Sequence, residues 1–163
     1  MASSYLLAFI IVQRLVELWI ACDNERKLKA AGAVEVGAAH YPVIVALHAG
    51  WVVWLCYAGW DRPISLPWLA VFGVLQLLRL WVLATLGPRW TTRVLVISGE
   101  TLVKRGPYRF ISHPNYAVVA AEMFVGPMAF GLWRAAIVFG LLNLAMLAWR
   151  ITVEERALKP LRT

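Results

Sequence analysis

Acidic residues and cysteines are scarce in this chain of 163 residues, and charged residues of both signs make up only 15% of it. The two cysteines, Cys22 and Cys56, form no CxxC pair and have no metal-ligand spacing, so ordinary core or lipid-facing roles are expected. The net charge is +7. In a soluble protein that charge would suggest nucleic acid, but 61% of this chain is hydrophobic. The basic residues therefore indicate the cytoplasmic loops of a membrane protein, and no nucleic-acid partner is expected.

The hydrophobic residues gather into blocks long enough to cross a bilayer, which takes roughly 20 apolar residues per helix. We expect five spans at about 4–22, 42–59, 64–86, 114–130 and 133–151. Only Gly131 and Leu132 separate the last two, which predicts an antiparallel helical hairpin. No basic residue precedes the first block and no Ala-x-Ala site follows it, so we expect a retained helix. The sequence predicts an all-α integral membrane protein with a single membrane domain over 1–163.

The Lys and Arg residues favour one orientation of these spans. Twelve of the sixteen lie in the segments 23–41, 87–113 and 150–163, whereas the opposite loops hold Arg62 and Arg134. Cytoplasmic loops carry the excess of Lys and Arg. We therefore expect a multi-pass protein of the bacterial inner membrane, with the N-terminus outside and the C-terminus in the cytoplasm.

One cytoplasmic segment departs from the helical pattern. Residues 94–97 are a β-branched run, 98–100 read as a turn, and 101–103 form a second short run. This pattern predicts a short β-hairpin before the last two helices, with an irregular loop as the alternative.

Ionisable side chains inside the spans need a partner or a function, because the bilayer interior penalises them. Arg14 and Glu17 are three residues apart and can pair on one helix face, with a substrate role as the alternative. Gln76 and Arg79 have the same spacing, and Arg79 needs a carboxylate. Glu122, well inside the fourth span, is the candidate.

Two polar clusters lie where the last two spans meet the cytosol. In the first, Pro114 opens a helix whose positive N-terminus can hold an anion, and His113 precedes it among basic and tyrosine side chains. In the second, Arg150 and Glu154 are one helical turn apart, where a solvated helix end is the alternative.

Together the clusters resemble the isoprenylcysteine carboxyl methyltransferase family, whose hallmarks are Gly-Pro-Tyr…Arg-His-Pro-x-Tyr and Arg…Glu-Glu-x-x-Leu. They read here Gly106-Pro107-Tyr108, Ser112-His113-Pro114-Asn115-Tyr116 and Arg150…Glu154-Glu155-Arg156-Ala157-Leu158. The stretches 24–26, 32–37, 40–42, 47–48 and 89–93 are similar to a bacterial subgroup often found with type III polyketide synthases. Members of that subgroup are thought to O-methylate alkylpyrones or alkylresorcinols. Ser112 stands where the family usually has arginine, and Arg109 could partly replace it.

The resemblance implies S-adenosylmethionine as cofactor, S-adenosylhomocysteine as product, and a lipophilic acceptor that enters from the bilayer. The methyltransferase core would span about 87–163, and a functional link to a type III polyketide synthase is expected. The resemblance implies catalytic roles for Arg150 and Glu154. The residues expected to bind the cofactor are Lys104, Gly106, Tyr108, Arg109, His113, Asn115, Tyr116, Glu154 and Glu155. The residues expected to bind the acceptor are His40, His48, Trp90 and Glu122. A phenol or enol acceptor has a proton to lose, and Glu154 or His48 could take it, with Glu154 preferred.

Two other functions stay open. A haem or electron-transfer protein could use His40, His48 and His113, although a spacing of eight residues places the first two about two turns apart. Ser112 leaves a non-catalytic membrane subunit possible. The chain has no GxGxxG, which argues against a Rossmann methyltransferase.

Overall fold

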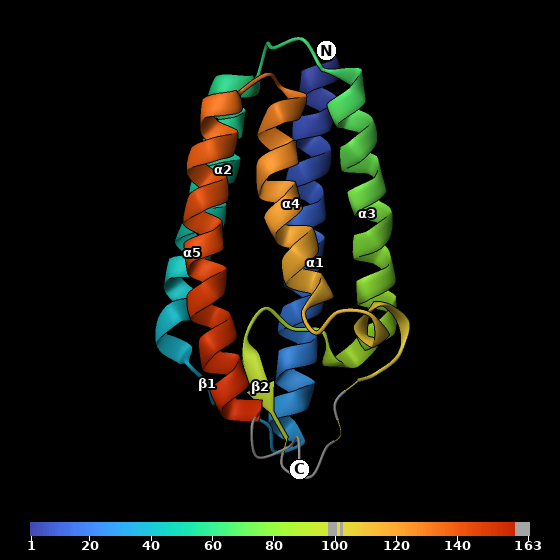
Figure 1. Ribbon diagram of the computed structural model, residues 1–163, viewed down its shortest axis with the longest axis vertical. Helices are drawn as coiled ribbons and strands as arrows, with labels where there is room; N and C mark the ends of the chain where they lie inside the picture. Colours follow the sequence, from blue (N-terminus) through green and yellow to red (C-terminus); the bar gives the residue numbers. More distant parts are fainter. Residues whose placement is uncertain (98–100, 102, 159–163) are drawn as a thin grey trace.

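Five α-helices run side by side along the long axis of the molecule (Figure 1). The computed structural model describes residues 1–97, 101 and 103–158. The helices are α1 (Ala2–Ala30), α2 (Tyr41–Gly59), α3 (Leu66–Leu86), α4 (Pro114–Ala129) and α5 (Trp133–Leu158). Each predicted span therefore corresponds to a helix, and α1 and α5 continue well beyond the predicted ends on the side where the basic loops gather.

Proline and glycine set several helix boundaries. Proline lies in the first turn of α2, α3 and α4, where its fixed φ suits the helix and its missing N–H costs nothing. Between α4 and α5, Gly131 has φ +69°. Its amide donates to the Met128 carbonyl at 3.0 Å, and the Leu132 amide donates to the Pro127 carbonyl at 2.9 Å. This short left-handed turn confirms the predicted C-terminal helical hairpin.

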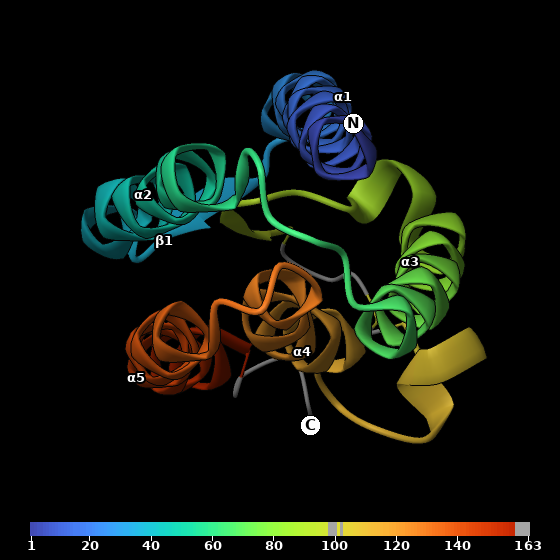
Figure 2. The same cartoon turned by 90° about the horizontal axis from the view of Figure 1, so that it is seen from above.

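Within the described part of the chain, four helices are long and apolar enough to cross a membrane. They cover Ala2–Ala30, Ala38–Gly59, Leu66–Arg89 and Trp133–Arg156. The fourth helix in the chain, α4, has 16 residues and is about 24 Å long, shorter than the roughly 30 Å hydrocarbon core. Viewed from the end, α4 lies between α3 and α5 (Figure 2). The all-helical membrane architecture is thus supported, whereas a fifth crossing stays a prediction.

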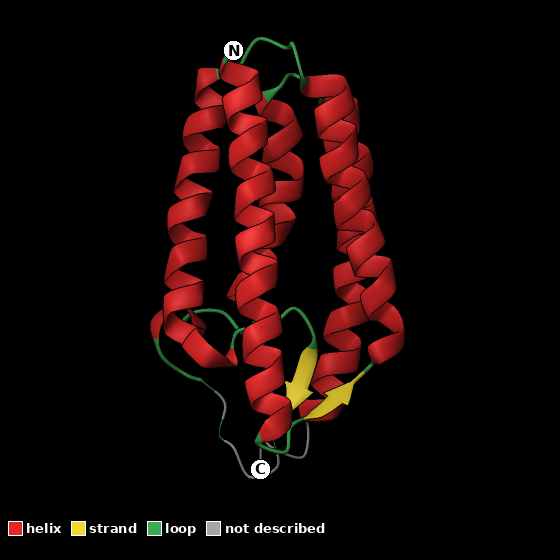
Figure 3. Ribbon diagram, turned by 180° about the vertical axis from the view of Figure 1, so that it is seen from behind, coloured by secondary structure: helices red, strands yellow, loops and turns green. Residues whose placement is uncertain are grey.

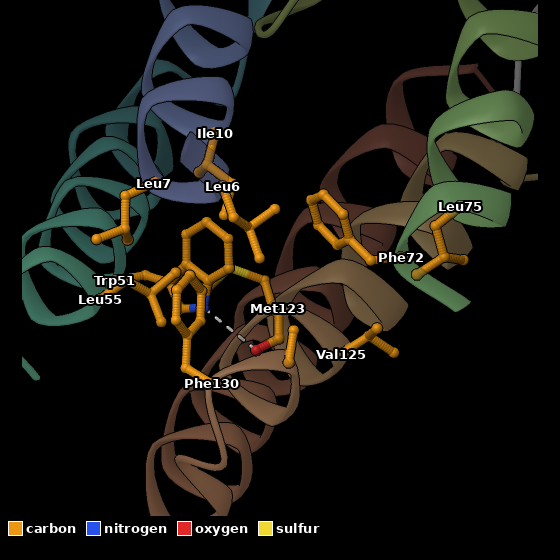
Figure 4. Packing of buried hydrophobic residues seen from close by; sticks show 11 residues of the cluster. Leu6, Leu7, Ile10, Trp51, Leu55, Phe72, Leu75, Met123, Val125 and Phe130 are labelled. Atoms are coloured by element: carbon orange, nitrogen blue, oxygen red, sulfur yellow. Dashed lines mark hydrogen bonds between the residues drawn. The ribbon is translucent and has the colours of Figure 1, made fainter. Parts of the chain in front are cut away.

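The apolar core lies in the half of the bundle that contains the N-terminus. Leu6, Leu7 and Ile10 of α1 meet Trp51 and Leu55 of α2 there, together with side chains of α3 and α4 (Figure 4). The indole N–H of Trp51 donates to the carbonyl of Met123 at 3.3 Å. A Cβ at Gly126 would lie only 2.6 Å from the Trp51 ring, so the missing side chain allows α2 and α4 to approach closely.

A two-stranded antiparallel sheet lies at the opposite end of the bundle (Figure 3). Strand β2 (Val94–Val96) pairs with β1 (Val34–Val36), in the register Val34 to Val96. The prediction of a strand at 94–97 is confirmed, but its assigned partner is wrong. Thr101 and Val103 are not in a strand, and residues 98–100 and 102 lie outside the described residues. The partner comes instead from the loop after α1.

Charged side chains tie this sheet to the helices. Glu35 of β1 accepts hydrogen bonds from Arg93 at 2.5 Å and from Lys29 of α1 at 3.0 Å. The Arg93 guanidinium also lies 4.0 Å from the centre of the Tyr41 ring at the start of α2. Burial tends to raise the pKa of Glu35, but the hydrogen bonds from Arg93 and Lys29 outweigh it and lower that pKa. The sheet is therefore fixed to α1 and α2 at the basic end of the bundle.

Candidate functional site

A cavity of about 1160 Å³ lies at this basic end. Its walls come from the last turns of α1 and α3, strand β2, the short 3-10 helix η3 (Gly106–Arg109), the start of α4 and the end of α5. Ligand pockets commonly measure roughly 300–1,000 Å³, so the space suffices for a cofactor of nucleotide size. The predicted site residues that line it are Trp90, Lys104, Tyr108, Arg109, His113, Asn115, Tyr116, Arg150 and Glu154.

Tyr116 joins the two sequence clusters. Its hydroxyl donates to a carboxylate oxygen of Glu154 and accepts a hydrogen bond from Arg150 Nε at 2.8 Å. The Arg150 guanidinium lies 5.2 Å from the centre of the Tyr116 ring. The Tyr116 hydroxyl of α4 thus holds the Arg150 and Glu154 side chains of α5 beside the cavity. Arg150 is buried, and Glu154 is partly exposed. Both signs of charge are available to a zwitterionic ligand.

His113 completes this cluster from the turn before α4. Its ring stacks on Tyr116 with centres 5.3 Å apart and planes 9° from parallel. Nδ1 lies 3.9 Å from a Glu154 oxygen, and Nε2 lies 3.9 Å from a Glu155 oxygen. Nε2 is buried and has no hydrogen-bond partner among the described residues. Glu155 does not line the cavity and lies beside the site at His113.

Gly106 and Tyr108 have different places in the wall. Gly106 has φ +56°, and a Cβ there would overlap the Thr85 side chain of α3. Gly106 therefore packs η3 against α3 and does not line the cavity. Tyr108 lines it, and burial, with a smaller effect from the Glu154 charge, raises the pKa of the Tyr108 hydroxyl. At neutral pH that hydroxyl stays a hydrogen-bond donor.

Trp90 supplies a second unpaired polar atom to the wall. The side chain is 4% exposed, and its indole N–H has no hydrogen-bond partner among the described residues. The Trp90 carbonyl accepts from the Asn24 amide at 2.8 Å, which fixes the residue against α1. Buried donors are nearly always paired in folded proteins. An unpaired donor in a cavity wall is therefore an indication of a bound ligand.

The other predicted acceptor-binding residues do not line this cavity. His40 ends the 3-10 helix η1 (Ala38–His40), is 3% exposed and packs against Trp149 of α5 with ring centres 6.0 Å apart. His48 lies deeper in α2 and is partly buried. Glu122 is fully buried in the middle of the bundle.

Glu122 belongs to a network of four charges inside the helices. It accepts hydrogen bonds from Arg79 Nε at 2.8 Å, from Arg14 Nη2 at 2.8 Å and from the Gln76 amide at 3.0 Å. Glu17 accepts from Arg14 at 2.9 Å and from Arg79 at 3.2 Å. The predicted pairs of Arg14 with Glu17 and of Arg79 with Glu122 are confirmed. The positive charges of the two arginines balance the negative charges of the two glutamates, so the network can be buried inside the bundle.

Part of the cavity wall was not predicted from the sequence. Thr91 and residues 93–97, which contain strand β2, line it, and so does Ser112. The sequence does contain a signal for β1, because apolar and polar residues alternate in Val34-Glu35-Val36 and a glycine lies on each side, at Gly32 and Gly37. In the structure both glycines have positive φ. Of the described residues, no group of three or more His, Cys, Asp or Glu side chains is arranged to hold a metal ion.

The comparisons with known proteins identify a family. The model of the isoprenylcysteine carboxyl methyltransferase (ICMT) family matches residues 68–160, which include most of α3 and all of α4 and α5. The chain is also 38% identical over 159 residues to the uncharacterized protein YpbQ of Bacillus subtilis (strain 168), which covers 94% of this chain and 95% of that one. No solved structure matches. The chain belongs to the isoprenylcysteine carboxyl methyltransferase family.

Proposed function

We propose that this protein transfers a methyl group from S-adenosylmethionine to an oxygen of a lipophilic acceptor held in the bilayer. Membership of the family implies an S-adenosylmethionine-dependent methyltransferase that acts on membrane substrates. The observation that carries the proposal is the Tyr116 hydroxyl, which joins Arg150 and Glu154 at the wall of a large cavity. All three residues lie inside the matched region.

The residues of the cavity fit this cofactor. S-adenosylmethionine carries a carboxylate, an ammonium group, ribose hydroxyls and an adenine ring. Arg150, with Lys104 and Arg109 nearby in the wall, suits the carboxylate, and Glu154 suits the ammonium or the ribose hydroxyls. The buried, unpaired nitrogens of Trp90 and His113 are available to a ligand that supplies their hydrogen bonds. Asn115 and Tyr116 belong to the same set, and Tyr108 adds a neutral hydroxyl.

The bound cofactor would supply an electrophilic methyl group, and the chain supplies position and exclusion of water. Arg150 is held by Tyr116 and can orient the cofactor or the acceptor oxygen. Glu154 is fixed by the same hydroxyl and by the nearby His113 ring. This arrangement lets a charged cofactor approach from the basic end of the bundle while an apolar acceptor approaches from between the helices.

We propose an alkylpyrone, an alkylresorcinol or an isoprenylcysteine-like carboxylate as the acceptor. The sequence similarity to the bacterial subgroup supports the first two, with a functional link to a type III polyketide synthase that would make them. The apolar helices make the chain a multi-pass membrane protein. The gathering of Lys and Arg at the cavity end supports an inner-membrane orientation in which this end faces the cytoplasm.

Transfer of a radiolabelled methyl group tests this function. Purified protein in lipid nanodiscs, given labelled S-adenosylmethionine and a bacterial membrane lipid extract, should label an organic-soluble product. Arg150→Ala and Glu154→Ala should lower the rate at least tenfold, since hydrogen bonds to charged groups contribute about 1.5–3 kcal/mol. Arg134→Ala is the matched control, because Arg134 lies at the opposite end of the same helix beside the Trp133 ring. Unchanged transfer in both site variants would contradict the assigned site.

A further inference from the structure

Residues 105–111, which contain η3, lie at the rim of the bundle, on the outer side of α3 (gold in Figure 2). Phe110 and Ile111 at the end of this segment are 71% and 51% exposed. Large apolar side chains gather at such exposure where a protein meets a partner or a membrane. What these two side chains contact therefore depends on the depth of the segment relative to the bilayer.

Contacts with α3 fix that depth. Arg105 Nη2 donates to the Thr85 carbonyl at 3.4 Å, and a Cβ at Gly106 would overlap the Thr85 side chain. The stretch from Leu66, where α3 begins, to Thr85 is about 30 Å long, which matches the thickness of the hydrocarbon core. Thr85 therefore lies at the boundary between acyl chains and headgroups, and segment 105–111 lies at the level of the membrane surface.

The charge around this segment has one sign. From 101 to 121 the chain contains Lys104, Arg105 and Arg109 and no acidic residue. Among the described residues, none of these three cations has an ion-pair partner. The Arg109 guanidinium instead lies 5.3 Å from the centre of the Phe110 ring. Basic and aromatic side chains at this depth are typical of segments that bind anionic lipids.

Three side chains of the segment face a different environment from the cavity. Arg105, Phe110 and Ile111 do not line the cavity, and we call these three residues the interfacial surface. The Arg105 guanidinium is a planar fork of N–H donors, of which one is bonded to the Thr85 carbonyl. Its other donors suit the oxygens of a phosphate, which arginine binds with two parallel hydrogen bonds.

We propose that the interfacial surface binds the headgroup of an anionic phospholipid at the basic end of the bundle. Arg105 binds the lipid phosphate, and Phe110 and Ile111 lie where the acyl chains begin. Because Tyr108 of the same short helix lines the cavity, the bound lipid also holds that part of the cavity wall against α3. The inference does not rest on the proposed function.

Native mass spectrometry of the purified protein in detergent tests the choice of lipid. Phosphatidylglycerol should occupy a site whose affinity falls about fivefold or more in Arg105→Gln, as expected for one basic side chain at an anionic surface. Arg105→Lys keeps the charge and should lose less, and phosphatidylcholine should bind the wild type and Arg105→Gln equally weakly. Arg26→Gln, which removes an exposed charge at the same end, is the matched control. Equal phosphatidylglycerol affinity in Arg105→Gln and the wild type, or the same loss in Arg26→Gln, would overturn the proposal.

Spin labelling tests the depth separately. A nitroxide at Ile111→Cys, in a chain with Cys22→Ser and Cys56→Ser, should collide with membrane-dissolved oxygen more than with a water-soluble nickel complex in phosphatidylglycerol nanodiscs. A label at Ala31→Cys, exposed and directly after α1, is the aqueous reference and should show the opposite preference. If the label at 111 prefers the nickel complex as the label at 31 does, the proposal is wrong. Neither measurement uses S-adenosylmethionine, so a failure of the proposed function leaves both results decisive.

Discussion

Replacing Glu122 by glutamine should be among the most destabilising single changes in this protein. The Glu122 side chain is fully buried, and that of Arg79 is 4% exposed. Together with Arg14 and Glu17 they form a neutral set of four charges. Glu122→Gln removes one negative charge and leaves two arginines facing a single glutamate inside the helices.

The structure sets the size of the expected loss. Removing one partner of a buried ion pair costs about 3–5 kcal/mol, because the remaining charge stays buried without compensation. At 1.36 kcal/mol for each factor of ten, this corresponds to a decrease of roughly 100- to 5,000-fold in the folding equilibrium constant. If Glu122 instead binds the acceptor, its replacement should change acceptor kinetics with little effect on stability.

Detergent-induced unfolding, followed by loss of helical circular dichroism, measures this difference. The matched control is the double variant Arg79→Met with Glu122→Leu, which removes both charges and leaves the pair of Arg14 with Glu17 at 2.9 Å. Replacing a buried pair by apolar side chains is often neutral, so the double variant should unfold close to the wild type. Unfolding of Glu122→Gln at the wild-type midpoint, or a double variant less stable than the single one, would show that the buried charges do not stabilise one another in this way.

Further predictions concern the cavity wall, the sheet and the orientation. Gly106→Ala should lower the unfolding midpoint, because its φ of +56° and the nearby Thr85 side chain leave no room for a Cβ, whereas Gly50→Ala, in an open helical position, should not. Glu35 has a lowered pKa, so its ion pairs should stabilise the fold above about pH 4.5 and cease to do so as the pH falls through that lowered value. Unfolding measured against pH should therefore lose this acid dependence in Glu35→Gln. Alkaline phosphatase inserted in the loop at 60–65 should be active, and a fusion after the C-terminus should not.

The blocks of apolar residues in the sequence predicted the helices well, because each block forms a single helix. Proline at the helix starts and Gly131 between the last two helices set boundaries close to those observed. The predicted first and last spans end at about residues 22 and 151, whereas helices α1 and α5 end at Ala30 and Leu158. The polar residues after each apolar block were taken as loop, although the helices continue through them. Hydropathy predicts which residues lie in the membrane, but a helix can continue into the aqueous phase beyond them.

Long-range pairing could not be predicted from local patterns. The β-branched run at 94–96 predicted a strand, but its partner lies about sixty residues earlier and carries only three strand residues. The charged pair of Arg79 with Glu122 was predicted from the cost of isolated charges, whereas the joining of both pairs into one network needed the packing of α1 against α3 and α4.

The sequence predicted which residues form the candidate site but not how they are arranged. His113, Tyr116, Arg150 and Glu154 do come together, because the hairpin of α4 and α5 brings the start of one helix beside the end of the other. The central place of the Tyr116 hydroxyl was not evident from the spacing of the motifs. It depends on the rotation of both helices about their axes, which only their packing determines.

Calorimetric titration of the purified protein in nanodiscs with S-adenosylmethionine measures whether the cavity beside Tyr116 binds this cofactor. We expect saturable binding of one cofactor per chain. Tyr116→Phe should weaken it at least tenfold, since this variant keeps the ring and removes the hydroxyl that holds Arg150 and Glu154. Absence of binding by the wild type would contradict the proposed function, and equal affinity in Tyr116→Phe would contradict the proposed site.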